Sequence, residues 1–408
     1  MLKGRIFSDL IVKKKKEKTM RPELRYPILK SLLSPLHGHQ KKSMALVIAA
    51  LVECGTARTM AMADKLVEWT GARFHSALER IYRLLKNDRI DELSLTRQLL
   101  KLMGSARNRE VLVGVDWTEW HSGLRMLIAS AVVGRRAIPL QAHAYTKSKI
   151  RRSQNIWENT FARMLARASK EAMVRIVLLC DRGFRRVSWL KLLIDLELDF
   201  VVRLKDDVHV HLPRLPDPVA LSNLGLKRGK TMDLGWVPIR QDAAVQVRVI
   251  GVWAPRAKSP WWLATSFRRR GVKKITAYYD RRMTIEEQIR DTKGKRFGTK
   301  LYWTQFKNPR ALSRFMLLLG FASLLWHCAG FLAAKQDNSR LLIHPTKGPR
   351  QSYITIGQRN LRLFAVYPPT RKLVRSSLIP PALRLFDWID SSHPPPKLSI
   401  SRLQRQKK

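Results

Sequence analysis

The spacing of hydrophobic positions divides this chain into two parts, with a change near residue 111. Between residues 20 and about 107, apolar residues recur every three or four positions, which predicts helices. The helical runs read MALVIAALVECG, TMAMADKLVEWTG and ARFHSALERIYRLLKN, with a turn expected at Gly71. Two short helices around a glycine turn are typical of a DNA-binding helix-turn-helix, and a plain helical bundle with a basic surface fits the pattern equally well.

Beyond Val111 the apolar runs become short and continuous, as in strands that are buried on both faces. The order is three strands, a helix, a strand, a helix and a strand: VLVGVDWTEW, LRMLIASAVVG, AIPLQAHAY, SQNIWENTFARMLARASK, VRIVLLCDRGF, RRVSWLKLLIDL and DFVVRLK. The first three strands can form a meander, and the helical crossovers place the fourth and fifth parallel to the first. We therefore expect an α/β fold with a mixed five-stranded sheet and helices on its faces.

The second half of the chain returns to this core after an interruption. Residues 206–260 contain frequent prolines and alternating stretches, which predicts a β-rich insertion. WWLATSF then predicts a strand, and a helix is expected over about 272–293. The apolar run 315–334 is long enough to cross a bilayer, but it contains His327 and has basic flanks, so we interpret it as a buried core helix.

These patterns give expected domain boundaries. They are a disordered basic tail over 1–19, a helical DNA-binding domain over 20–107, a core over 108–205 and 261–335, the insertion over 206–260, and a basic C-terminal region over 336–408. The C-terminal region is rich in Pro, Arg and Ser, with shorter helical pieces, and is our candidate for dimerisation.

The charge of the chain identifies a class of partner. Lys and Arg number 78 against 31 Asp and Glu, a formal net charge of +47. The basic residues run through the whole length, which favours a nucleic acid over a membrane surface, the second candidate on charge alone. In the third helical run, Arg73, Arg80 and Arg83 point outward and are candidate DNA contacts.

The three cysteines form no CxxC pair, which argues against a zinc site and fits a reducing cytoplasm.

Two aspartates follow strands that we expect to be parallel neighbours. Asp116 lies in the first strand and Asp181 ends the fourth, so both carboxylates should lie at one edge of the sheet. Taken singly, each Asp is explained as well by a helix cap or a turn. An isolated carboxylate in an apolar strand is costly unless a cation or hydrogen bonds accompany it.

A stripe of polar side chains marks the helix expected over 272–293. Tyr279, Arg282, Glu286 and Lys293 are spaced three, four and seven apart and therefore share one helix face. Alone, the stripe could be a solvated charged face with an Arg282–Glu286 pair. Because this helix can pack across the edge that carries the two aspartates, Glu286 becomes a third carboxylate there. Oxygen-only ligands suit two Mg²⁺ ions, or Mn²⁺, which would support in-line phosphodiester displacement.

The spacing Tyr-x2-Arg-x3-Glu-x6-Lys resembles the signature of the bacterial insertion-sequence-four family of DDE transposases. VDWTE around Asp116 and CDRGF around Asp181 are similar to the two aspartate motifs of that family, and WWLATS resembles the strand before its signature helix. The resemblance spans about 111–330. One position departs from the pattern, since some members have an aromatic residue where this chain has Met283.

The resemblance implies an RNase H-like catalytic core, interrupted by the insertion, and cut-and-paste transposition through a DNA hairpin. It assigns the metals to Asp116, Asp181 and Glu286. A phosphate near a flipped base would be held by Tyr279, Arg282 and Lys293. Trp261 would stack on that base, and strand alternation turns Trp262 to the opposite face.

The resemblance further implies double-stranded DNA as the partner, a homodimer in the DNA complex, and a cytoplasmic, nucleoid-associated location. Two other functions stay open from the sequence. One is a structure-selective nuclease on the same core, and the other is a non-catalytic DNA-binding protein.

Overall fold

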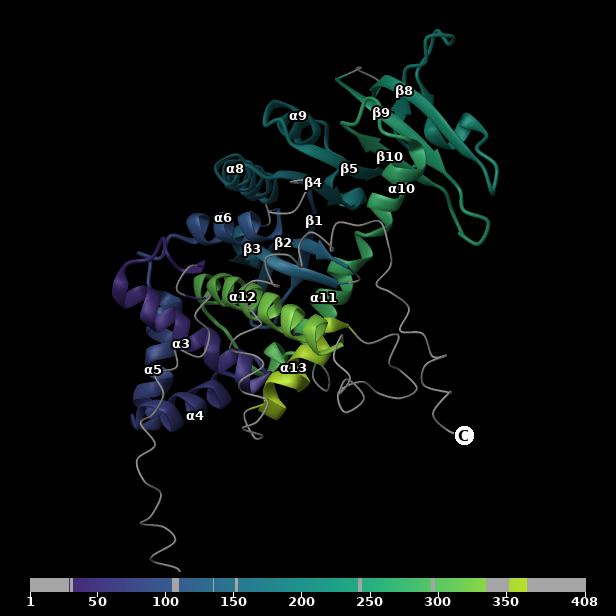
Figure 1. Cartoon of the computed structure of the whole chain (residues 1–408). Coiled ribbons are helices and arrows are strands. Elements are labelled where there is room, and N and C mark those ends of the chain that lie inside the picture. The colour runs from purple at the N-terminus through teal and green to yellow at the C-terminus, as the bar shows by residue number, and fades with distance from the viewer. Residues whose placement is uncertain are drawn as a thin grey trace, which may run out of the picture.

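In the computed structural model, the described residues before the ten-stranded sheet include the helices α3 to α6 (Figure 1). The structure describes residues 29, 32–104, 110–134, 136–150, 153–240, 244–294, 298–334 and 352–364. The predicted basic tail over 1–19 lies outside the described residues, as does most of the predicted C-terminal region over 336–408.

The N-terminal helices are α3 (Gly38–Cys54), α4 (Thr59–Thr70), α5 (Phe74–Lys86) and α6 (Glu92–Met103). Gly71 ends α4 with a left-handed φ of 66°, a conformation that glycine adopts without steric cost, so the turn lies where the sequence predicted it. In α5, Ile81 and Leu85 are buried while Arg80 and Arg83 are exposed, which confirms the predicted faces of this helix.

The five strands expected from the sequence are β1 (Glu110–Glu119), β2 (Leu124–Val133), β3 (Arg136–Thr146), β4 (Arg175–Cys180) and β5 (Asp199–Leu204). They lie in the order β3-β2-β1-β4-β5, with β1, β4 and β5 parallel and β2 and β3 antiparallel. The crossovers are α8 (Gln154–Ala172) and α9 (Val187–Asp195), with a short α7 (Lys147–Ile150) before them. This mixed sheet with its helices is compatible with an RNase H-like transposase core.

The sheet is larger than the five strands predicted. β10 (Trp261–Thr265) pairs antiparallel with β5, and the insertion continues the sheet through β9 (Val245–Val252) and β8 (Thr231–Ile239) to β6 (His209–Val210) and β7 (Val219–Ala220). Figure 1 shows the insertion strands extending the sheet away from the N-terminal helices. The sheet extends beyond five strands because the unpaired backbone N–H and C=O groups at the edge of β5 form hydrogen bonds with β10.

The helix expected over 272–293 is divided into α10 (Val272–Asp280) and α11 (Met283–Lys293). At the junction, Arg281 N donates to Tyr278 O at 3.1 Å and Thr284 N donates to Arg281 O at 3.0 Å, which are tighter i to i+3 bonds. The Thr284 hydroxyl also donates to Arg281 O at 2.8 Å and so competes for that carbonyl. Prediction of one continuous helix was therefore wrong at this point.

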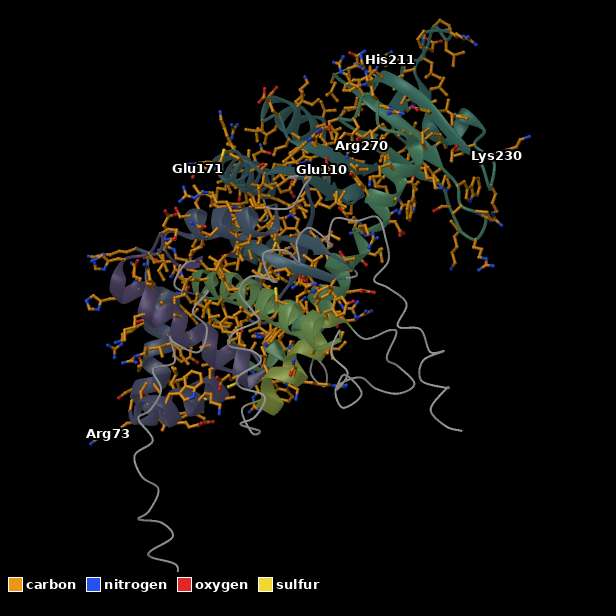
Figure 2. All side chains as sticks on the ribbon, in the orientation of Figure 1. Arg73, Glu110, Glu171, His211, Lys230 and Arg270 are labelled. Atoms are coloured by element: carbon orange, nitrogen blue, oxygen red, sulfur yellow. The ribbon has the colours of Figure 1, made fainter. Side chains whose placement is uncertain are left out.

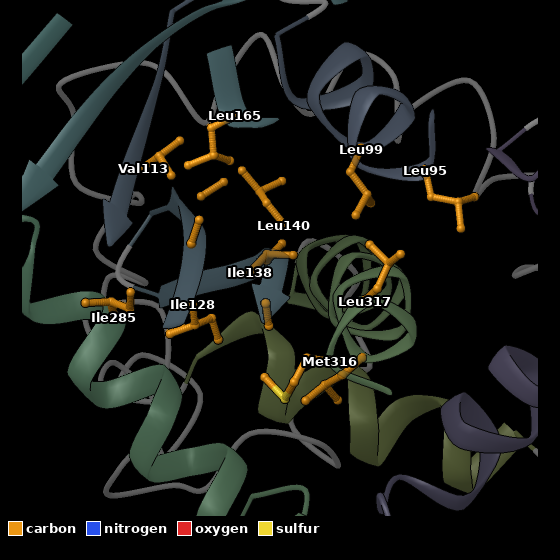
Figure 3. Packing of buried hydrophobic residues seen from close by; sticks show 14 of the residues in the cluster. Leu95, Leu99, Val113, Ile128, Ile138, Leu140, Leu165, Ile285, Met316 and Leu317 are labelled. Atoms are coloured by element: carbon orange, nitrogen blue, oxygen red, sulfur yellow. The ribbon is translucent and has the colours of Figure 1, made fainter. Parts of the chain in front are cut away.

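The apolar run identified in the sequence forms α12 (Pro309–Ala334), against which α13 (Tyr353–Phe364) packs. Length and composition would allow α12 to cross a membrane, but its apolar stretch is wholly buried inside the protein, as predicted for a core helix. Trp326 Nε1 donates to Val52 O in α3 at 3.1 Å. Figure 3 shows Leu99 of α6, Leu140 of β3 and Leu317 of α12 in one hydrophobic core. The N-terminal helices and the sheet thus share this core.

Candidate active site

The two aspartates end adjacent parallel strands. Val115 of β1 pairs with Cys180 of β4, so Asp116 and Asp181 follow at the same edge. Asp181 caps the short 3₁₀ helix η2 (Arg182–Phe184), with its Oδ1 accepting from Gly183 N at 2.9 Å. The carboxylate of Asp116 accepts from Trp117 N at 2.8 Å. The predicted convergence of the two carboxylates is therefore present in the structure.

Helix α11 lies directly against β1, which brings Glu286 to the same edge. A Cβ on Gly114 would lie 3.2 Å from Cβ of Ile285, tighter than most carbon contacts, so the glycine permits this close approach. The packing is supported by a hydrogen bond of 3.1 Å from the Ser130 hydroxyl to Gln288 Oε1. Because Glu286 follows the buried Ile285, the packing of one residue fixes the position of the other.

Arg282 connects two of the three carboxylates. Its Nη1 lies 3.5 Å from Oδ2 of Asp116, and its Nη2 donates to Oε1 of Glu286. The Arg282 side chain is only 12% exposed, and its guanidinium carbon lies 6.0 Å from the ring centroid of Tyr279. One guanidinium thus serves as the counter-cation of both carboxylates.

The pKa of Asp116 responds to the charges of the other two carboxylates. Burial, followed by the negative charge of Asp181, raises the pKa of Asp116 to about 6, with a further contribution from Glu286 and an opposing one from Arg282. Three carboxylates facing one guanidinium leave an excess of negative charge. Such an excess in a partly buried site favours binding of a cation.

The donor set fits a hard divalent cation, because all candidate ligands are carboxylate oxygens. Within the described ranges, however, no three His, Cys, Asp or Glu side chains are arranged to hold one metal ion. Arg282 lies against both Asp116 and Glu286. The ligand chemistry therefore suits Mg²⁺, provided that Arg282 moves away from the carboxylates.

Lys293 fastens the end of α11 to β1. Its Nζ donates to Oγ1 of Thr118 at 2.6 Å and to the backbone O of Glu119, and it lies 5.5 Å from the Trp120 ring centroid. Burial lowers the pKa of Lys293. Thr118 was missed from the sequence, although its place two residues after Asp116 puts both on the same strand face.

Trp261 and Tyr279 form an aromatic pair on the α10 side of the sheet. Their ring centroids are 5.1 Å apart with an angle of 76°, and burial raises the pKa of Tyr279. Trp262 is buried against Gly251, so the two tryptophans face opposite sides as strand alternation predicted. Arg203 of β5 is close enough for its charge to affect Tyr279, and sequence analysis did not single it out. A charged residue inside the apolar run DFVVRLK was the available signal.

The remaining predicted residues lie outside this cluster. Met283 is exposed beside Arg282, with its sulfur 3.7 Å from Nη2 of that arginine. Arg73, Arg80 and Arg83 are exposed on or beside α5. Figure 2 shows Arg73 projecting from the α4–α5 end of the molecule, away from α11. DNA contacts at these arginines stay a prediction.

In a comparison with known families, residues 131–325 match the model described as a transposase DDE domain. The matched segment contains Asp181, Trp261 and the stretch from Tyr279 to Lys293, whereas Asp116 precedes it. No curated protein gives a significant match. The family match supports a DDE transposase, an enzyme whose substrate is DNA.

Proposed function

We propose that this DDE-type chain is a cut-and-paste transposase similar to the insertion-sequence-four family. It would cut a mobile element at terminal inverted repeats and insert it into target DNA. The observation that carries the proposal is the meeting of Asp116, Asp181 and Glu286 where β1, β4 and α11 converge. The Arg282 guanidinium, which lies 3.5 Å from Asp116 and pairs with Glu286, supports grouping Glu286 with the two aspartates.

Asp116, Asp181 and Glu286 would hold two Mg²⁺ ions, or Mn²⁺ in their place. Bound there, the ions would activate the attacking oxygen and stabilise the leaving oxygen of an in-line displacement. The position of Asp181 is fixed by its hydrogen bond to Gly183 N, and that of Glu286 by the packing of Ile285. Ligands that are held in place before the substrate arrives lose little entropy on binding.

Arg282, Tyr279 and Lys293 would hold the phosphate beside the carboxylates. An arginine fork binds a phosphate through two parallel hydrogen bonds. When the phosphodiester and the cations arrive together, the Arg282 guanidinium can exchange its carboxylate partners for phosphate oxygens. Lys293 stays near the strand end through Thr118, which positions its ammonium on the path of the DNA backbone.

Trp261 would stack on a base that has left the duplex. A hairpin at the element end requires a sharp turn of one strand, and stacking offsets the cost of unstacking a base there. The edge-to-face contact with Tyr279 holds the Trp261 ring in one orientation. This arrangement supports a hairpin route over direct double-strand hydrolysis.

The proposed reaction consists of successive phosphodiester displacements. Water attacks one strand and leaves a free 3′-hydroxyl, which attacks the opposite strand, displaces the 3′-hydroxyl of the flanking DNA and closes the hairpin. A second water opens the hairpin, and the 3′-hydroxyl then attacks target DNA and displaces a target 3′-hydroxyl. The exposed arginines of α5 would bind the element ends, with two copies of the chain in a cytoplasmic DNA complex.

The direct test is incubation of the full chain with Mg²⁺ and DNA that contains the inverted repeats flanking its gene. We expect hairpin ends and joined products from the wild type. Loss of a residue that only supports a metal ligand lowers activity by up to about 100-fold. Glu286→Ala, which would remove a ligand itself, should therefore reduce both products by more than that factor. Glu287→Ala is the matched control, because its carboxylate pairs with Arg136 instead.

Other outcomes identify the other functions. Cleavage without hairpins or joining would indicate a structure-selective nuclease. Binding without any cleavage would indicate a non-catalytic DNA-binding protein.

A further inference from the structure

Two exposed aromatic rings lie just beyond the end of α11. Trp303 is 60% exposed and Tyr302 is 38% exposed, in the short 3₁₀ helix η4 (Leu301–Trp303). Within the part of the chain that the structure describes, no other Phe, Tyr or Trp side chain is exposed. Large aromatic side chains left in water are typical of surfaces that bind a partner.

The chain around these rings is held firmly, so their exposure is built into the fold. Ala57 N in the α3–α4 turn donates to Thr299 O at 2.6 Å, and the Thr304 hydroxyl donates to Ala57 O at 2.9 Å. On the other side, Thr299 N donates to Asp291 O in α11 at 3.1 Å. Leu301 is fully buried. The segment is thereby fastened to both the helical region and the catalytic helix.

A row of side chains connects the exposed rings to the candidate active site. Tyr302 packs edge to face against His121, with ring centroids 5.1 Å apart, and the His121 and Trp120 rings are 5.5 Å apart. Trp120 in turn faces the ammonium of Lys293. His121 follows Asp116 by five residues along the chain. A strand of DNA that leaves the carboxylates past Lys293 would therefore meet Tyr302 next.

The charge around the rings selects the kind of partner. Arg58, next to Ala57, and Lys307, four residues after Trp303, are both exposed, and Lys300 directly precedes η4. A second copy of the chain would bring the same positive charge onto it, which is unfavourable. A polyanion with unpaired bases satisfies both the cations and the aromatic rings, as in other single-strand binding surfaces.

We propose that Tyr302 and Trp303 form an aromatic platform that stacks on an unpaired base of the bound DNA. The proposal rests on the proposed function, in that DNA is the ligand. From Glu286 to Lys293 the helix rises ~10 Å, which is roughly three nucleotide steps along a strand, and the Trp120 and His121 rings separate Lys293 from Tyr302. The platform thus receives a base more than three nucleotides from the reacting phosphate, and it is distinct from the Trp261–Tyr279 pair.

The test measures DNA binding by the full chain in EDTA, so that cleavage plays no part. The probes are a labelled oligothymidylate and a fully paired duplex of equal length. We expect Trp303→Ala to weaken oligothymidylate binding by roughly tenfold, with little effect on the duplex. Trp303→Phe should retain most of the affinity, and Ile156→Ala, an exposed apolar residue on α8, should change neither probe. The salt dependence should stay as in the wild type, because no cation is removed.

Equal losses on both probes, or no loss on the oligothymidylate, would overturn the proposal. A dimer by light scattering that the variant dissociates, with unchanged DNA binding, would assign the rings to a second copy. If Trp303→Ala unfolds, Trp303→Leu replaces it in the test. Leucine keeps an apolar side chain but has no ring, so it should show the same loss of oligothymidylate binding. Absence of cleavage in the Mg²⁺ assay would refute the proposed function alone, because the platform is measured without metal.

Discussion

The guanidinium of Arg282 lies 3.5 Å from the carboxylate of Asp116, so the candidate active site contains its own counter-cation. The same guanidinium binds Glu286, which lies four residues further along the chain. Arg282 therefore makes the helical ion pair that its spacing to Glu286 allows, and it also reaches across to β1, where it reduces the repulsion among the carboxylates.

The first prediction concerns competition between Arg282 and a metal ion. Arg282→Gln should raise the affinity of the DNA-free protein for Mn²⁺ by roughly tenfold, because a cation is removed from a partly buried site. The Mn²⁺ affinity of Arg282→Lys should lie between those of the wild type and Arg282→Gln, since an ammonium keeps the charge but cannot bridge both carboxylates. Titration calorimetry measures the affinity. Unchanged or weaker Mn²⁺ binding by Arg282→Gln would show that the guanidinium does not compete.

The second prediction follows from the pKa of Asp116, raised to about 6 mainly by burial. Between about pH 4 and pH 6 the folded protein holds a proton that the unfolded chain has released. Stability therefore falls as pH rises through this window, and the penalty is complete above about pH 6. In EDTA at pH 8, Asp116→Asn should increase the free energy of unfolding by up to roughly 3 kcal/mol and so raise the unfolding midpoint. At pH 4 the same substitution should change the midpoint little.

Mg²⁺ provides the control for this second prediction. It should stabilise the wild type at pH 8, where Asp116 is ionised, and have less effect on Asp116→Asn. If the unfolding midpoints of the wild type and Asp116→Asn differ by the same amount at pH 4 and at pH 8, the raised pKa does not belong to Asp116.

The third prediction tests the contact that positions Glu286. Gly114→Ala would place a methyl group 3.2 Å from Cβ of Ile285, so it should destabilise the protein by about 1–3 kcal/mol and displace α11. Ile285→Ala keeps Cβ but removes Cγ2 and Cδ1, which would lie 3.3 Å and 3.5 Å from the added methyl group, so the double variant should regain part of the stability and of the DNA cleavage. Denaturant unfolding and the cleavage assay, applied to both single variants and the double variant, measure the energetic coupling between the two residues. Purely additive losses would show that the two residues act independently.

The fourth prediction separates two adjacent tryptophans. Trp261→Ala should suppress hairpin formation while the first nick persists, because the ring is needed only when a base leaves the duplex. Trp262→Ala should instead lower stability by about 3–5 kcal/mol, since that side chain is buried. Trp261→Phe should keep part of the hairpin activity. Loss of nicking with Trp261→Ala would place the ring in substrate binding rather than in base flipping.

Much of the site could be predicted because it depends on local periodicity and on the crossover rule. Parallel neighbouring strands carry their C-terminal residues to one edge, and this brought Asp116 and Asp181 together correctly. The opposite faces of Trp261 and Trp262 likewise follow from the two-residue period of a strand. The faces of the tryptophans depend only on residues near in sequence, whereas the meeting of the aspartates depends on the general rule for crossover connections.

The features that the sequence did not reveal depend on distant or competing contacts. The break between α10 and α11 reflects the hydroxyl of Thr284 bonding to a backbone carbonyl, which helical periodicity does not show. The pairing of β10 with β5 and the bond from Lys293 to Thr118 join segments far apart in the chain. The aromatic platform was missed because exposure depends on the tertiary fold rather than on residue type.

The burial of α12 has a consequence for how this protein can evolve. Trp326 of α12 bonds to α3, and Arg314 of the same helix bonds to Leu85 O in α5 at 2.6 Å, while the helix also covers β3. A fragment ending near residue 107 would leave the apolar face that α12 covers in contact with water. Exchange of the whole helical segment between genes would therefore disrupt this shared core, whereas point substitutions on the exposed surface of α5 would leave these contacts in place.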